Sequence, residues 1–127
     1  MKKTIGLIRK KIGMSRVFGE DGNVIPVTVI QAGPCAVLQK KVKETDGYEA
    51  LQVGFDEQAA HRLNKPQVGH QKKAESGFYR HLKEFRLPST EGYEVGQKLT
   101  VDMFELGDKI SVNGTSKGRG FMGPMRR

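Results

Sequence analysis

Apolar and polar residues alternate along much of this chain, a pattern that indicates short β-strands separated by turns. Residues 48–55 show it most clearly, because Leu51, Val53 and Phe55 fall on one face of an extended chain. Turn residues recur at short intervals between such runs. This spacing predicts a mainly β protein built around a small barrel or closed sheet.

The first two strands are expected to form a hairpin. Residues 15–18 and 24–30 flank the dipeptide Asp21-Gly22, which favours tight turns because it tolerates a positive φ. Pro26 has no backbone N–H to donate, so its strand is expected at an edge or a bulge.

Four more segments have the composition of strands. They comprise residues 35–42, 84–87, 99–103 and 109–112. Each is apolar or alternating, and all but residues 99–103 adjoin a proline or an aspartate. We therefore expect strands along most of the chain.

Helical signals are confined to the middle of the chain, around residues 57–76. Asp56 is placed to cap a short helix over residues 57–63, and Pro66 suits the first position of a second one. Gly69 and Gly77 limit that second helix. The sequence thus predicts a short helical insertion in a β domain.

Charge is unevenly distributed along the 127 residues, whose formal net charge is +8. Residues 1–43 contain nine Lys and Arg against two acidic residues, whereas residues 44–115 contain nine against twelve. Residues 116–127 add four cations and no acid. Positive charge at both ends favours a protein that docks on nucleic acid by one side.

The last thirteen residues, 115–127, have too little apolar surface to offset the entropy lost on ordering. Their cations and glycines suit a phosphate-rich surface, which Lys and Arg neutralise and a glycine backbone approaches closely. A frayed basic terminus is the simpler alternative. The G-x-G-x-x-G spacing of residues 118–123 is not taken as a dinucleotide site, because Pro124 follows and no βαβ unit contains it.

The sequence has no recognisable catalytic or metal-binding constellation. Cys35 is the only cysteine and lies in an apolar run, which favours a buried small hydrophobe over a nucleophile paired with a histidine. His61, His70 and His81 lack metal-ligand spacing. We expect no catalytic residue, metal, cofactor or small-molecule substrate.

No apolar run in the sequence approaches the ~20 residues of a membrane span. The apolar stretch near the N-terminus is also too short for a signal peptide. We therefore expect a soluble intracellular protein with no membrane partner, in a reducing compartment.

Several segments of the chain carry, in order, a resemblance to one family. Residues 5–18, IGLIRKKIGMSRVF, resemble the opening of the universal large-subunit ribosomal protein L-three family in its bacterial form. Residues 22–30, 64–70 and 84–86 are similar to the segments that follow in that family. Residues 112–121, VNGTSKGRGF, are similar to the family's most distinctive segment.

The resemblance implies a translation-protein-type β-barrel in residues 1–114 and, in residues 115–127, the start of a basic extension that penetrates rRNA toward the peptidyl-transferase centre. It implies a structural, non-enzymatic constituent of the large ribosomal subunit. Such a protein binds 23S-type rRNA, supports early subunit assembly and contacts neighbouring ribosomal proteins. The expected location is the cytoplasm, in a ribosome of bacterial type, with an organellar ribosome left open.

Members of the family continue for many tens of residues beyond the position of Arg127. The tip of the extension, its methylated glutamine and the final strands therefore fall outside this sequence. We expect the barrel to be incomplete without them.

The predicted RNA-binding residues are cations together with the polar, glycine and aromatic residues among them. They are Lys2, Lys3, Arg9, Lys10, Lys11 and Arg16 near the N-terminus, Lys65, His70, Lys72 and Lys73 in the insertion, and Thr115, Ser116, Lys117, Gly118, Arg119, Gly120, Phe121, Arg126 and Arg127 in the extension. The cations are expected to neutralise phosphates, while arginines or Phe121 stack on unpaired bases. Lys40, Lys41 and Lys43 form a further cluster that fits a solvated strand end equally well.

Two functions of other classes are left open by the residues alone. A protein–protein module would dock a partner on its mildly acidic centre and bind it whether or not RNase is present. A small enzyme that uses Cys35 would show rapid thiol labelling in the native state.

Overall fold

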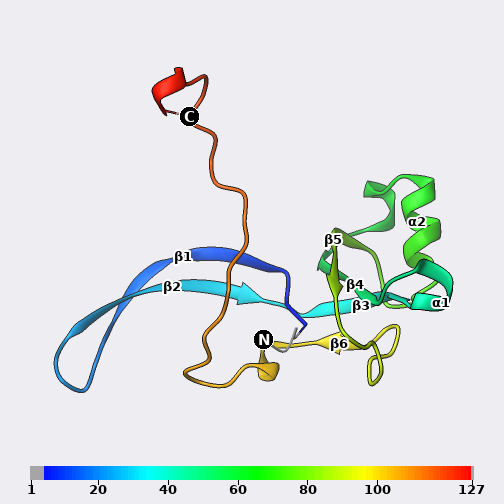
Figure 1. Cartoon of the computed structure of the whole chain (residues 1–127), viewed down its shortest axis with the longest axis horizontal. Helices are drawn as coiled ribbons and strands as arrows, with labels where there is room; N and C mark the ends of the chain where they lie inside the picture. The colour runs from blue at the N-terminus through cyan, green and yellow to red at the C-terminus, as the bar shows by residue number, and fades with distance from the viewer. Residues whose placement is uncertain (1–4, 127) are drawn as a thin grey trace.

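The computed structural model describes residues 5–126 and contains two antiparallel β-sheets (Figure 1). The strands are β1 (Arg9–Phe18), β2 (Val24–Ala32), β3 (Cys35–Lys41), β4 (Ala50–Glu57), β5 (Tyr79–Arg86) and β6 (Lys98–Leu99). The helices are α1 (Lys43–Asp46) and α2 (Lys65–Lys72), with 3-10 turns η1 (Ala60–Arg62), η2 (Val101–Met103) and η3 (Pro124–Arg126). The predicted mainly β class with a short helical insertion is confirmed.

The two sheets do not close on each other within residues 5–126. One sheet contains only β1 and β2, and the other has the strand order β5–β4–β3–β6. The predicted barrel or closed sheet is therefore not formed by the described residues, whose β-structure is open.

β1 and β2 form the predicted hairpin, which projects from the rest of the molecule (Figure 1). Its turn is closed by a 2.8 Å hydrogen bond from Gly19 N–H to Asn23 O, and Gly22 takes the positive φ of 74° that the turn requires. Pro26 lies opposite Arg16 in the two-stranded sheet, where both strands are edges. The predicted edge position of this proline is confirmed.

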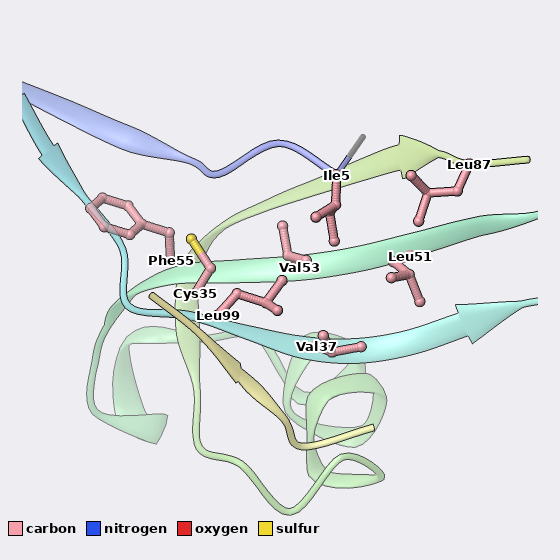
Figure 2. Packing of buried hydrophobic residues seen from close by; sticks show 8 residues of the cluster. All are labelled: Ile5, Cys35, Val37, Leu51, Val53, Phe55, Leu87 and Leu99. Carbon is pink, nitrogen blue, oxygen red and sulfur yellow. The ribbon is translucent and has the colours of Figure 1, made fainter. Parts of the chain in front are cut away.

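The main core lies on one face of the four-stranded sheet (Figure 2). Its buried members are Ile5, Cys35, Val37, Leu51, Val53, Phe55, Leu87 and Leu99. The alternation predicted within residues 48–55 is confirmed, because its three apolar positions all belong to this cluster. Full burial of such a side chain stabilises the fold by roughly 1.5–3 kcal/mol.

The helical insertion covers the other face of that sheet. Ala36 alternates with the core residues of β3 and packs with Leu38, Ala74 and Tyr79 in a second cluster. Gly54 leaves room for the Tyr79 ring, since a Cβ at Gly54 would lie 2.7 Å from Tyr79 Cγ. The insertion is therefore fixed to the sheet by close packing.

The helix predicted over residues 57–63 was wrong. β4 continues through Glu57, which pairs with Tyr79 of β5, and Gln58 N–H then donates to Phe78 O at 2.8 Å. A neighbouring strand supplies these backbone partners, whereas a short isolated helix is only marginally stable. Only the single turn η1 follows, before α2 begins at Lys65, one residue ahead of Pro66.

The strands predicted over residues 99–103 and 109–112 were also wrong, except for Leu99 in β6. Residues 101–103 form the turn η2, and residues 109–112 have no regular structure. Ile110 and Val112 are 52% and 62% exposed, so no sheet in residues 5–126 covers them. Alternation predicts a strand only where a partner strand and a covering layer exist.

Candidate nucleic-acid interface

The predicted RNA-binding residues fall into three regions of the structure: the hairpin, the helical insertion and the C-terminal segment (Figure 1). Within residues 5–126, Arg9 is half-buried and all the others are exposed. Lys2, Lys3 and Arg127 lie outside the described residues. The predicted RNA-binding residues within this range therefore lie wholly or partly at the surface.

The hairpin gathers cations on one of its faces through a bulge in β1. The register shifts between Lys11 and Gly13, so Lys11 pairs with Ile30 while Gly13 pairs with Val29. Five residues apart, Lys11 and Arg16 would face opposite ways in a regular strand; with the extra residue they face the same way. The bulge therefore produces a basic face that sequence spacing alone argues against.

The helical insertion is basic throughout. Residues 58–74 contain no acidic residue, and Lys65, Lys72 and Lys73 are all exposed. Within residues 5–126, the ion pairs formed by Lys and Arg involve Lys41, Lys43 and Arg80, and none involves a cation of this insertion.

The insertion has further exposed polar side chains besides its lysines. His70 Nε2 lies 2.6 Å from Gln52 Oε1, which holds the ring against β4. His61 and Arg62, in η1, are exposed next to the predicted cations and were missed. The absence of acids over residues 58–74 was the signal that could have found them.

The C-terminal segment, residues 115–126, runs away from both sheets and ends far from them (Figure 1). We call these residues the arm. All of them are exposed except Met122, which is half-buried, and Phe121 is 98% exposed. Gly120 has φ +74°, a conformation that side-chain-bearing residues rarely adopt. The arm is thus an exposed basic segment that carries an exposed aromatic ring, Phe121.

The cluster of Lys40, Lys41 and Lys43 fits a strand end better than a contact surface. Lys41 Nζ lies 3.0 Å from Glu84 Oε1 and donates to the Tyr48 hydroxyl at 2.9 Å. The Tyr48 hydroxyl in turn donates to Glu84 at 3.0 Å. These hydrogen bonds raise the pKa of Lys41 and lower that of Glu84. The charge of Lys41 is thus compensated within the fold.

Cys35 occupies a buried structural position. Its side chain is 0% exposed, and its Sγ donates a weak hydrogen bond to Ile8 O at 3.5 Å. Burial raises the pKa of this thiol. A hollow of about 200 Å³ lies beside it, and no histidine is among the described residues that line it. This environment disfavours the reactive thiolate.

Residues 5–126 contain neither a cluster of metal-ligating side chains nor a helix suited to a membrane. In this part of the chain no group of three or more His, Cys, Asp or Glu is placed to hold a metal ion. None of the helices described has the length and apolar character needed to cross a membrane.

Comparison with curated proteins finds relatives that share one name, although no protein-family model matches the chain. Large ribosomal subunit protein uL3 of Natranaerobius thermophilus is 53% identical over 127 residues, which is 100% of this chain and 60% of that protein. The uL3 proteins of Geobacter sulfurreducens and Desulforapulum autotrophicum are 54% identical over 127 residues and 52% identical over 122 residues. The latter two alignments cover 100% and 96% of this chain, and 60% and 59% of those proteins.

The chain therefore spans about 60% of the length of the curated relatives it matches. Its similarity to them is continuous from residue 1 to residue 127 in two of the three comparisons, so it includes the hairpin, the insertion and the arm. The predicted resemblance to the L-three family is confirmed: over 96–100% of its length, this chain is similar to proteins named large ribosomal subunit protein uL3.

Proposed function

We propose that this chain is a structural, non-enzymatic constituent of the large ribosomal subunit that binds 23S-type rRNA. Its relatives carry the name of a large ribosomal subunit protein. On this proposal it works in the cytoplasm, in a ribosome of bacterial type, beside other ribosomal proteins, and it supports early assembly of the subunit near the peptidyl-transferase centre.

The arm carries the proposal. It combines Lys117, Arg119 and Arg126 with glycines and no acid, and it is exposed along nearly its whole length. A segment of this composition gains little from packing on its own protein, so its ordering depends on a partner. Phosphates supply that partner, because cations displace condensed counterions when they bind RNA.

The arm and the hairpin have different tasks in this proposal. Thr115, Ser116, Gly118 and Gly120 let the arm thread between RNA backbones, and Phe121 stacks on an unpaired base. In the hairpin, Arg9, Lys11 and Arg16 share one face and contact phosphates, and Lys10 projects from the other face. Lys2, Lys3 and Arg127 are proposed to add contacts at the two ends of the chain. RNA binding therefore uses charge distributed over several elements.

Salt dependence of binding tests the role of the arm. We compare the chain with a variant carrying Lys117→Ala, Arg119→Ala and Arg126→Ala, using fragments of bacterial 23S rRNA as probe. Each phosphate contact contributes about 0.7–0.9 to the slope of log K against log salt, so loss of three contacts lowers the slope by about 2–3.

The matched control carries Arg80→Ala, Lys83→Ala and Lys98→Ala, three exposed cations outside the three basic regions. This variant has the same net charge as the arm variant and is expected to retain the wild-type slope to within about one contact. Equal slopes for the two variants would show that net charge, not the arm, governs binding. Failure of the unaltered chain to bind the rRNA would overturn the proposed function itself.

A further inference from the structure

Gly69 occupies a position in α2 where a glycine is unexpected. It lies inside the helix Lys65–Lys72, and glycine destabilises a helix interior relative to alanine because it loses more backbone freedom on folding. A conformational requirement does not explain it, since Gly69 is not among the residues with positive φ.

Packing inside the protein does not explain this glycine either. A Cβ built on Gly69 meets no atom within 4 Å apart from the local helix backbone, so an alanine fits there in the described structure. By contrast, a Cβ at Gly54 would meet the Tyr79 ring at 2.7 Å. The space above Gly69 is open, which points to something outside the chain that approaches the helix closely.

The side chains around Gly69 identify the chemistry of that approach. Lys65 precedes it by four residues, and Lys72 and Lys73 follow it by three and four, so all three lie on its face of the helix. All three are exposed, and none of the ion pairs within residues 5–126 involves them. The opposite side of α2 is turned to the sheet, where Gln71 is 1% exposed. The outer face of α2 thus exposes its backbone at Gly69, and lysine side chains lie around that position.

The N-terminus of α2 adds nothing to this binding face. Asn64 N–H donates to Gln67 Oε1 at 3.3 Å in a capping box, and Pro66 in the first turn has no N–H to offer an anion. Anion contacts on this face therefore come from side chains.

We propose that the face formed by Lys65, Gly69, Lys72 and Lys73 is a docking site for the sugar–phosphate backbone of an RNA helix. The inference rests on the proposed function but concerns a different element from the arm. A backbone seated over Gly69 places phosphates within reach of the lysines on either side. A base-specific contact is not required, because shape and phosphates dominate recognition of double-stranded RNA.

This docking site lies apart from the arm. α2 is at the opposite end of the molecule from the hairpin, and the arm leaves in another direction (Figure 1). On this proposal, α2 and the arm therefore contact different stretches of RNA, and their contributions to the salt slope of binding add.

Gly69→Ala separates this inference from a purely structural role. The variant is expected to unfold at a higher urea concentration than the wild type, because alanine favours the helix and fits the open space. It is also expected to bind 23S rRNA fragments about fivefold more weakly or worse, because the methyl group blocks close approach. A folding defect would move both measurements downward, so opposite signs are diagnostic.

A second variant tests the charges, and the arm variant serves as reference. Lys65→Ala, Lys72→Ala and Lys73→Ala together lower the salt slope by about 2–3, and combination with the arm substitutions lowers it further by a similar amount. If Gly69→Ala and the triple variant both bind like the wild type while the arm variant is weakened, the docking site is wrong and the proposed function stands. If the unaltered chain does not bind RNA, both are overturned.

Discussion

Gln71 is the side chain that fixes α2 to the sheet, and its replacement by leucine tests how the basic helix is held. Gln71 belongs to α2, is 1% exposed, and contacts Tyr79 at the start of β5. Tyr79 N–H donates to Gln71 Oε1 at 2.6 Å, and Gln71 Nε2 donates to Tyr79 O at 3.2 Å. One amide thus satisfies both backbone groups of Tyr79.

The magnitude follows from those two hydrogen bonds. Leucine has nearly the volume of glutamine but no polar atoms, so Gln71→Leu removes both partners of Tyr79 without leaving a large cavity. A buried polar group left unsatisfied costs about 1–3 kcal/mol, and two of them cost about 2–6 kcal/mol. The apolar leucine recovers roughly 1.5–3 kcal/mol by its own burial. With the middle of each range, a cost of about 4 kcal/mol and a gain of about 2 kcal/mol, we expect a net loss of about 2 kcal/mol, a sizeable share of the roughly 5–15 kcal/mol typical of a domain.

Urea unfolding measures the loss, and amide hydrogen exchange locates it. Exchange is expected to accelerate across α2 and at Tyr79 more than in β3 and β4, because stability is lost where the helix docks. The control is Gln67→Leu on the same helix, an exposed residue whose side chain accepts one 3.3 Å bond from Asn64 N–H. This control is expected to cost at most about 1 kcal/mol. A Gln71→Leu variant with the wild-type midpoint and unchanged exchange in α2 would refute the assigned role of the amide.

Two more predictions concern titratable groups. The hydrogen bond from Lys41 lowers the pKa of Glu84 below its ordinary 4.5, so Glu84 contributes stability above that range and loses it as pH falls through the folded-state pKa. Glu84→Gln is accordingly less stable than the wild type at neutral pH, and the gap in urea midpoint closes as the medium becomes more acidic than about pH 4.5; a gap that is constant with pH contradicts this. Cys35, fully buried and with a raised pKa, is expected to react with a thiol reagent at neutral pH only as fast as the protein opens. Labelling as rapid as that of a free thiol would reinstate the enzyme alternative.

Those parts of the fold that depend on nearby residues could be predicted from the sequence. The hairpin was predicted because its turn and both strands lie within one short stretch, and the strand around Leu51, Val53 and Phe55 because a buried sheet face requires alternation. The extent of β4 was not predictable, because its last pairing is with Tyr79, more than twenty residues away. Residues 109–112 have the strand pattern without a strand, since burial depends on a partner that the pattern does not specify.

The same distinction between nearby and distant determinants applies to the candidate RNA-binding residues. Their type and exposure could be inferred from charge, and the structure places the described ones on the surface. Their grouping could not, because the bulge after Lys11 decides which hairpin cations share a face. The prediction that Gly69 limits the helix was wrong, because α2 continues through it to Lys72. The open space around Gly69 depends on packing, which the sequence pattern does not specify.

The difference in support between α2 and the arm bears on how each would bind RNA. α2 is already ordered, since Gln71 and the packing of Ala74 against Tyr79 hold it to the sheet before any RNA is present. Binding at Gly69 therefore costs little conformational entropy, and more of the contact energy contributes to affinity. The arm lacks such packing over most of its length, and its contacts must offset the cost of ordering each of its residues. On this reasoning, the helix face supplies a preorganised contact that fixes orientation, and the arm follows the RNA to which the helix has already docked.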